Sequence, residues 1–144
     1  MTDQIQCSVT LTQVSTELVE LLREPGWFIN DGKKLRNHVI SEFGDKAIII
    51  DEEHGSFEFL ILQRDDVPVK NYPWRSQFYS VNPSGPGGTT VTFDITQEQE
   101  FTLTVTESGF ETLGLGAEEL AKLIDGNTEA WNLELGLAAG LAIS

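Results

Sequence analysis

Three stretches decide the fold: Val91-Thr-Phe-Asp-Ile95, Phe101-Thr-Leu-Thr-Val105, and the Pro-free segment from Ala117 to the C-terminus. In the first two, apolar and polar residues alternate, as in strands that bury one face. The turn at Gln97-Glu98-Gln99 predicts that they form a hairpin. The threonines of this hairpin are expected to face water, and its buried face would carry Val91, Phe93, Ile95, Phe101, Leu103 and Val105.

The segment from about 117 to 142 carries apolar residues at helical spacing. Its main stripe consists of Leu120, Ile124, Trp131, Leu135, Ala138 and Ala142. At ~1.5 Å per residue the helix would be about 39 Å long, enough to cross a sheet. Gly126 costs about 1 kcal/mol relative to Ala in a helix interior, so the alternative is a helix that begins near Asn127.

The remainder of the chain reads as strands with one short helix. Ile5 to Thr12 alternates as a strand, and residues 15–22 form a helix that Pro25-Gly26 ends. Four further strands are expected at about 35–43, 46–52, 56–64 and 74–82. The predicted fold class is α+β: a curved antiparallel sheet of about six to seven strands, crossed by a long C-terminal helix. Such an architecture commonly encloses a cavity.

Composition limits the range of functions. The 144 residues predict a single domain, 1–144, and nine Lys and Arg against 23 Asp and Glu give a net charge of −14. So acidic a surface repels nucleic acid and anionic membranes, and it favours either solubility or a basic partner. The single cysteine, Cys7, excludes an internal disulfide, and we expect it to be inert. With no signal peptide and no spanning segment visible, the expected location is cytoplasmic.

Two stretches carry a family resemblance: Leu103-Thr-Val-Thr-Glu-Ser-Gly-Phe110 and Gly126-Asn-Thr-Glu-Ala-Trp-Asn-Leu-Glu-Leu135. With the order of elements, they resemble the START-like (SRPBCC) superfamily, and within it the bacterial homologues of the activator of heat-shock protein 90 ATPase. The resemblance implies a helix-grip fold, also called Bet v 1-like, with a cavity between sheet and helix. Ala130 replaces a frequent Gly, and Trp27-Phe28 replaces a usual Trp pair.

The resemblance implies several functions, because this superfamily contains ligand carriers, cyclases, hydrolases and co-chaperones. We expect a small-molecule binding module for a hydrophobic or mixed-polarity ligand. One alternative is a co-chaperone-like protein that uses its acidic face on a basic partner such as a chaperone middle domain. The other is a cyclase- or hydrolase-type enzyme, with His38 and Glu42 exchanging protons. No catalytic motif is visible, so a non-enzymatic role is favoured and no cofactor is expected.

A ligand cavity of this type needs apolar walls and a few polar groups. The alternative is that the same aromatic rings fill a solid core. The candidate lining residues are Trp27, Phe28, His38, Phe59, Trp74, Phe78, Phe93, Phe101, Trp131 and Leu135.

The remaining features have simpler interpretations. His54, in Asp51-Glu-Glu-His-Gly55, is interpreted as part of a solvated turn, so no metal site is predicted. Arginines in the strands would pair with carboxylates or hold an anionic ligand; they are Arg36, Arg64 and Arg75. The spacing of Gly136 and Gly140 favours either close packing on the sheet or a dimer contact, so the chain would be a monomer or a weak homodimer.

Overall fold

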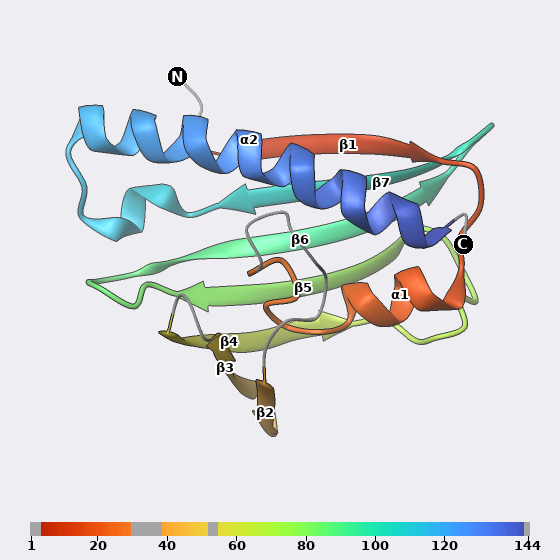
Figure 1. The fold of residues 1–144 in the computed structure, drawn as a ribbon, viewed down its shortest axis with the longest axis horizontal. Coiled ribbons are helices and arrows are strands. Elements are labelled where there is room, and N and C mark those ends of the chain that lie inside the picture. Colours follow the sequence, from red (N-terminus) through yellow and green to blue (C-terminus); the bar gives the residue numbers. More distant parts are fainter. Residues whose placement is uncertain (1–3, 30–38, 52–54, 143–144) are drawn as a thin grey trace.

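The computed structural model describes residues 4–29, 39–51 and 55–142. Within these residues, every expected strand and both expected helices are present (Figure 1). The part of the expected 35–43 strand before Val39 lies outside the described residues. A single 3-10 turn, η1, is additional. In chain order the elements are β1 (Ile5–Leu11), α1 (Thr16–Leu22), β2 (Val39–Phe43), β3 (Lys46–Asp51), β4 (Gly55–Arg64), β5 (Trp74–Val81), β6 (Gly88–Gln97), β7 (Phe101–Ser108), η1 (Phe110–Leu113) and α2 (Ala117–Ala142).

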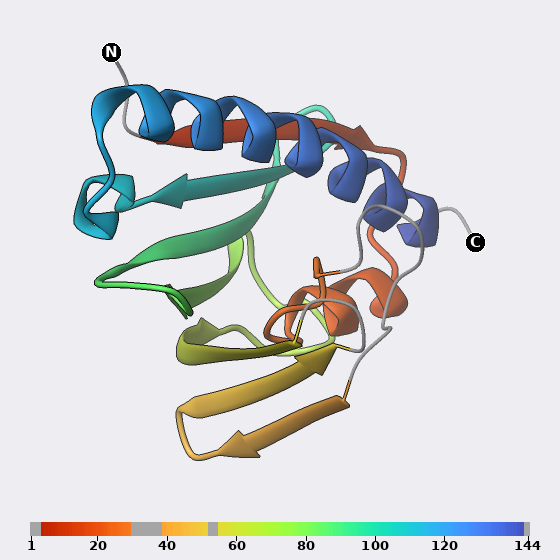
Figure 2. The same cartoon turned by 60° about the vertical axis from the view of Figure 1, so that its left-hand side comes forward.

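The strands form one seven-stranded sheet in the order β1-β7-β6-β5-β4-β3-β2. Every neighbouring pair is antiparallel. Strands β2 to β7 follow one another as in a meander, whereas β1 crosses over to pair with the last strand, so that Cys7 lies opposite Val105. The sheet curves around α1, and α2 runs along β1 and β7 (Figure 2).

The alternation of the β6–β7 hairpin is confirmed on its buried face. Val91, Phe93, Ile95, Leu103 and Val105 are all at most 1% exposed. Phe101, at the far end of the hairpin, is only half-buried. On the outer face the expectation of water-facing threonines fails at Thr92, which is 8% exposed and accepts a 2.9 Å hydrogen bond from Gln77 Nε2.

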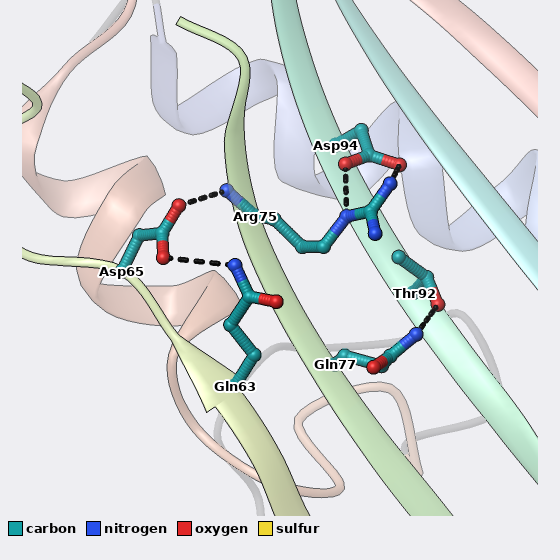
Figure 3. A network of polar contacts seen from close by, with 6 residues as sticks. All are labelled: Gln63, Asp65, Arg75, Gln77, Thr92 and Asp94. Atoms are coloured by element: carbon teal, nitrogen blue, oxygen red, sulfur yellow. Dashed lines mark hydrogen bonds and ion pairs between the residues drawn. The ribbon is translucent and has the colours of Figure 1, made fainter. Parts of the chain in front are cut away.

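A polar network joins β5 and β6 and the chain just after β4 on this outer face (Figure 3). Arg75 Nε donates to Asp94 Oδ1 at 2.7 Å, and the backbone N–H of Arg75 donates to Asp65 Oδ2 at 2.9 Å. Gln63 donates to the other oxygen of Asp65. The hydrogen bond and charge of Asp94 raise the pKa of the Arg75 guanidinium. These residues pair with one another on the outer face.

Helix α2 is continuous through its 26 residues, so the alternative start near Asn127 is wrong. Gly126 lies on the exposed side, where an added Cβ would meet nothing within 4 Å. The added Cβ of Gly136 or Gly140 would also meet open space, and both are exposed. Close packing on the sheet therefore does not explain their spacing, and the dimer contact stays a prediction.

Ring contacts and hydrogen bonds place the two helices against each other and against the inner side of the sheet. The Trp131 ring lies 5.6 Å from the ring of Phe93 on β6, measured between centroids, and 4.8 Å from that of Phe28. Ser15 caps α1 by accepting from Leu18 N–H at 3.1 Å, and its hydroxyl donates to the Leu141 carbonyl at 2.8 Å. The C-terminal helix therefore packs on the concave face, as predicted, and the architecture is an α+β helix-grip fold.

Candidate functional site

A buried carboxylate, Glu107, lies where β7 passes beneath α2. It follows Leu103 and Val105 at a spacing of two, so its side chain shares their inward face. Glu107 is only 7% exposed. An acidic side chain is costly to bury unless partners satisfy it, so this position calls for a structural or functional explanation.

Three neutral donors satisfy Glu107. Trp131 Nε1 donates to Oε1 at 2.8 Å, and Thr89 Oγ1 donates to Oε2 at 2.7 Å. Asn127 Nδ2 lies 3.4 Å from Oε1, which is a long and weak contact. Two residues of α2 and one of β6 thus converge on one carboxylate of β7.

A pocket of about 180 Å³ opens beside this cluster. Its walls combine two aromatic rings with two carboxylates and one amide; they are Phe28, Glu107, Asn127, Ala130, Trp131 and Glu134. Glu134 is 4% exposed, while Ala130 is exposed and forms part of the rim. Asn127, Trp131 and Glu134 face the pocket together because positions i, i+4 and i+7 share one side of a helix.

A second hollow, of about 130 Å³, lies on the other side of the Glu107–Asn127 contact. Its walls come from the β5–β6 connection, η1 and α2, and include Thr89, Phe110 and Leu123. Glu107 and Asn127 border both hollows. Glu107 and Asn127 therefore lie between the two hollows.

The structure brings two of the predicted lining residues to this pocket, Phe28 and Trp131. Five others are buried in the hydrophobic core and border none of these hollows: Trp27, Phe59, Phe78, Phe93 and Leu135. Their packing accords with the solid-core alternative for this part of the molecule.

The remaining predicted lining residues are elsewhere. Trp74 borders a polar hollow of about 340 Å³ in the β4–β5 connection, where its Nε1 donates to the Asp66 carbonyl at 2.9 Å. Phe101 packs against Tyr72, with ring centroids 5.5 Å apart. His38, like His54 and Arg36, lies outside the described residues.

The other candidate groups have structural partners. Glu42, proposed as a proton-transfer partner of His38, forms a two-pronged contact with Arg64, with Nη2 to Oε1 at 3.0 Å. Arg64 and Arg75 thus both pair with carboxylates, as the simpler interpretation expected. Cys7 is buried, and burial raises the pKa of its thiol. A raised pKa leaves less thiolate at neutral pH, so Cys7 is not an activated nucleophile.

Sequence reasoning missed Glu107, Asn127, Glu134 and Thr89, although two signals pointed to the first two. The alternation that buries Leu103 and Val105 continues one step to Glu107. The apolar stripe of the helix contains Leu120, Ile124 and Trp131, and its spacing leaves one position between the last two where another apolar residue is expected. The polar residue Asn127 lies at this position. One polar residue on the apolar face of the strand and one on the apolar face of the helix together indicated that two polar side chains meet in the interior.

No family model and no curated protein matches the sequence. Solved structures do match the fold. An uncharacterised protein from Bacillus thuringiensis has a TM-score of 0.63 at 9% identity, covering 98% of this chain and 99% of its own. The di-domain ARO/CYC protein BexL, from the BE-7585A biosynthetic pathway, has a TM-score of 0.63 at 10% identity, covering 98% of this chain.

DynU16, a protein in the dynemicin biosynthetic locus, has a TM-score of 0.58 at 22% identity. The chain spans 48% of the length of DynU16 and 50% of the length of BexL. Likeness at these identities concerns the fold alone, and it agrees with the helix-grip architecture described above. No helix among the described residues is both long and apolar enough to cross a membrane.

Proposed function

We propose that this protein binds a small organic molecule in the pocket between α2 and the sheet. The observation that carries the proposal is the pocket of about 180 Å³ at which the buried Glu107 carboxylate meets the rings of Trp131 and Phe28. Apolar walls with a few convergent polar groups are typical of ligand sites. Biosynthetic proteins among the fold neighbours also support small-molecule binding, since one of them, BexL, is an ARO/CYC protein.

The pocket volume limits the size of the ligand. Liquid water occupies about 30 Å³ per molecule, so the volume corresponds to roughly six waters. This accommodates a one-ring compound more readily than a fused polyketide. A binding role is proposed ahead of cyclase or hydrolase chemistry, because Glu107 already has structural partners: Thr89 of β6 and Trp131 of α2 each donate a short hydrogen bond to its carboxylate.

A melting-temperature screen with a blocked-pocket variant tests this proposal. A ligand at 100 times its Kd stabilises the folded state by about 2.7 kcal/mol, a Tm rise on the order of 5–10 °C for a chain of this size. Ala130→Phe should abolish the rise, because Ala130 forms part of the rim. Ala121→Phe is the matched control, since Ala121 is exposed on the same helix and borders none of these hollows.

The result expected is a set of one-ring compounds whose Tm shift survives Ala121→Phe and disappears in Ala130→Phe. A shift that persists in Ala130→Phe would place binding elsewhere and contradict the proposal. So would a screen of lipids, isoprenoids and aromatic compounds in which no compound shifts Tm.

A second candidate function is an interaction with a basic protein partner, in line with the resemblance to the heat-shock ATPase activator homologues. The net charge of −14 favours it, because opposite charge speeds association and strengthens weak contacts. Both functions are proposed for a cytoplasmic protein. Capture of a purified chaperone middle domain that weakens steeply as salt rises would support the second function, and capture insensitive to salt would contradict it.

A further inference from the structure

We infer that the ligand of this pocket is a small organic cation, a protonated amine attached to an aromatic or apolar group. This inference rests on the proposed function and specifies its ligand class. It depends on the chemistry around Glu107, whose carboxylate is the polar group that both hollows share with Asn127.

The first argument is that the described part of the chain places no positive charge beside Glu107. Its hydrogen-bond donors are an indole, an amide and a hydroxyl, all neutral. Among the described residues, no Lys, Arg or His borders either hollow or forms an ion pair with Glu107. Buried carboxylates in proteins are ordinarily paired with a cation or hold a metal ion, so a ligand cation would complete this site.

The second argument is the remaining hydrogen-bonding capacity of the carboxylate. An ionised carboxylate offers about four lone-pair positions. Trp131 and Thr89 occupy two of them with short bonds, and the 3.4 Å contact from Asn127 occupies a third only weakly. An ammonium N–H in the pocket would donate to a free lone pair of the Glu107 carboxylate and would displace the long contact from the Asn127 amide.

The third argument is the aromatic wall. Phe28 and Trp131 border the same pocket, with centroids 4.8 Å apart and ring planes inclined at 51°. Aromatic faces attract cations through their quadrupole, and a carboxylate beside them adds direct charge attraction. Glu134 contributes a further carboxylate to the wall and has an interaction of its own, so the cation is assigned to Glu107.

The test compares benzylamine with benzyl alcohol, which have the same shape and number of non-hydrogen atoms but differ in charge near neutral pH. Binding is followed by the NMR signal of the Trp131 indole N–H, which Trp131→Phe identifies among the three tryptophans. We expect benzylamine to shift this signal with an affinity at least about tenfold higher than that of benzyl alcohol, as a charged hydrogen bond provides.

Charge is then changed in the protein. Glu107→Gln keeps the side-chain length and should weaken benzylamine about tenfold while leaving benzyl alcohol nearly unchanged. Glu129→Gln removes the same charge from the exposed side of α2 and should leave both affinities unchanged. A second pair avoids altering the buried group: Ala130→Lys at the exposed rim should repel benzylamine, and Ala130→Gln should not.

Three results would overturn the cation assignment. The first is equal affinity of the amine and the alcohol; both compounds then shift the Trp131 signal, and the proposed small-molecule binding stands without a preference for cations. The second is a loss of benzylamine binding in Glu129→Gln as large as in Glu107→Gln, which would mean a general response to protein charge. The third is an unmoved Trp131 signal with benzylamine while neutral compounds pass the blocked-pocket screen; the cation assignment then fails and the proposed function stands.

Discussion

The hydrogen bond between Trp131 Nε1 and Glu107 Oε1, at 2.8 Å, joins α2 directly to β7. We predict that Glu107→Met and Trp131→Phe are strongly coupled in their effects on stability. Methionine keeps the side-chain length and removes the acceptor, while phenylalanine keeps a ring and removes the donor. Either single change leaves a buried group without its partner, whereas the double variant places two apolar groups together.

The size of the coupling follows from the chemistry of the bond. A hydrogen bond to a charged group contributes about 1.5–3 kcal/mol. The free energy of unfolding of the double variant should therefore exceed the value expected from adding both losses by about 1.5–3 kcal/mol. Effects of Glu107→Met on Thr89 and Asn127 occur in the single and the double variant alike, so they cancel in the cycle.

Urea unfolding followed by far-UV circular dichroism measures all four proteins, because this signal does not depend on the removed indole. The matched control cycle pairs Trp131→Phe with Glu129→Met, an exposed residue of the same helix that does not face Trp131. The control losses should add to within about 0.5 kcal/mol. A coupling for Glu107 and Trp131 no larger than that of the control would refute the buried hydrogen bond and the site built on it.

Three further predictions test other parts of the structure. Gly126→Ala should raise the free energy of unfolding, measured in urea, by about 0.5–1 kcal/mol, because the added methyl group meets open space in a continuous helix. Gly26→Ala should lower the free energy of unfolding, since Gly26 has φ +72° and an added Cβ would lie 2.8 Å from Ile49 Cγ1. A loss in Gly126→Ala would contradict the continuity of α2. Leu135→Ala should cost about 2–5 kcal/mol in the same assay, because Leu135 is 2% exposed, and a loss below about 1 kcal/mol would contradict its burial. Burial raises the pKa of Cys7, so a disulfide reagent at about pH 8 should modify it slowly in the native protein and rapidly in urea, and equal rates would contradict the burial. Because the unfolded thiol ionises first, stability should also fall as pH rises above the ordinary thiol pKa of about 8.5.

Local sequence patterns were sufficient to identify the secondary structure. Alternation with a period of two appears in β1, β6 and β7 because a strand buries every second side chain. The helical stripe of α2 survives Gly126 because one exposed glycine costs about 1 kcal/mol, less than the burial of Trp131 and Leu135 returns. The order of these elements then led to the helix-grip architecture.

The pairing of residues distant in the sequence is a different matter. The neighbour of β1 is β7, with Leu11 opposite Phe101 and Ile5 opposite Glu107, and strand periodicity carries no information about which strand pairs with which. Local spacing is equally uninformative about which of the predicted aromatic residues line a pocket. The sequence predicted Trp27, Phe59 and Phe78 as cavity walls together with Phe28 and Trp131, but only the packing of the folded chain separates these core residues from the two rings at the pocket.

By itself, then, the sequence determined which segments are strands or helices and which faces they bury, since these follow from the spacing of neighbouring side chains. It also determined the acidic character of the molecule. Tertiary structure alone decided that Glu107 meets Asn127 and Trp131, and that hollows remain on both sides of their contact. The physical reason is that a buried charge and an unfilled volume depend on how two elements 20 residues apart or more approach each other, which local spacing does not encode.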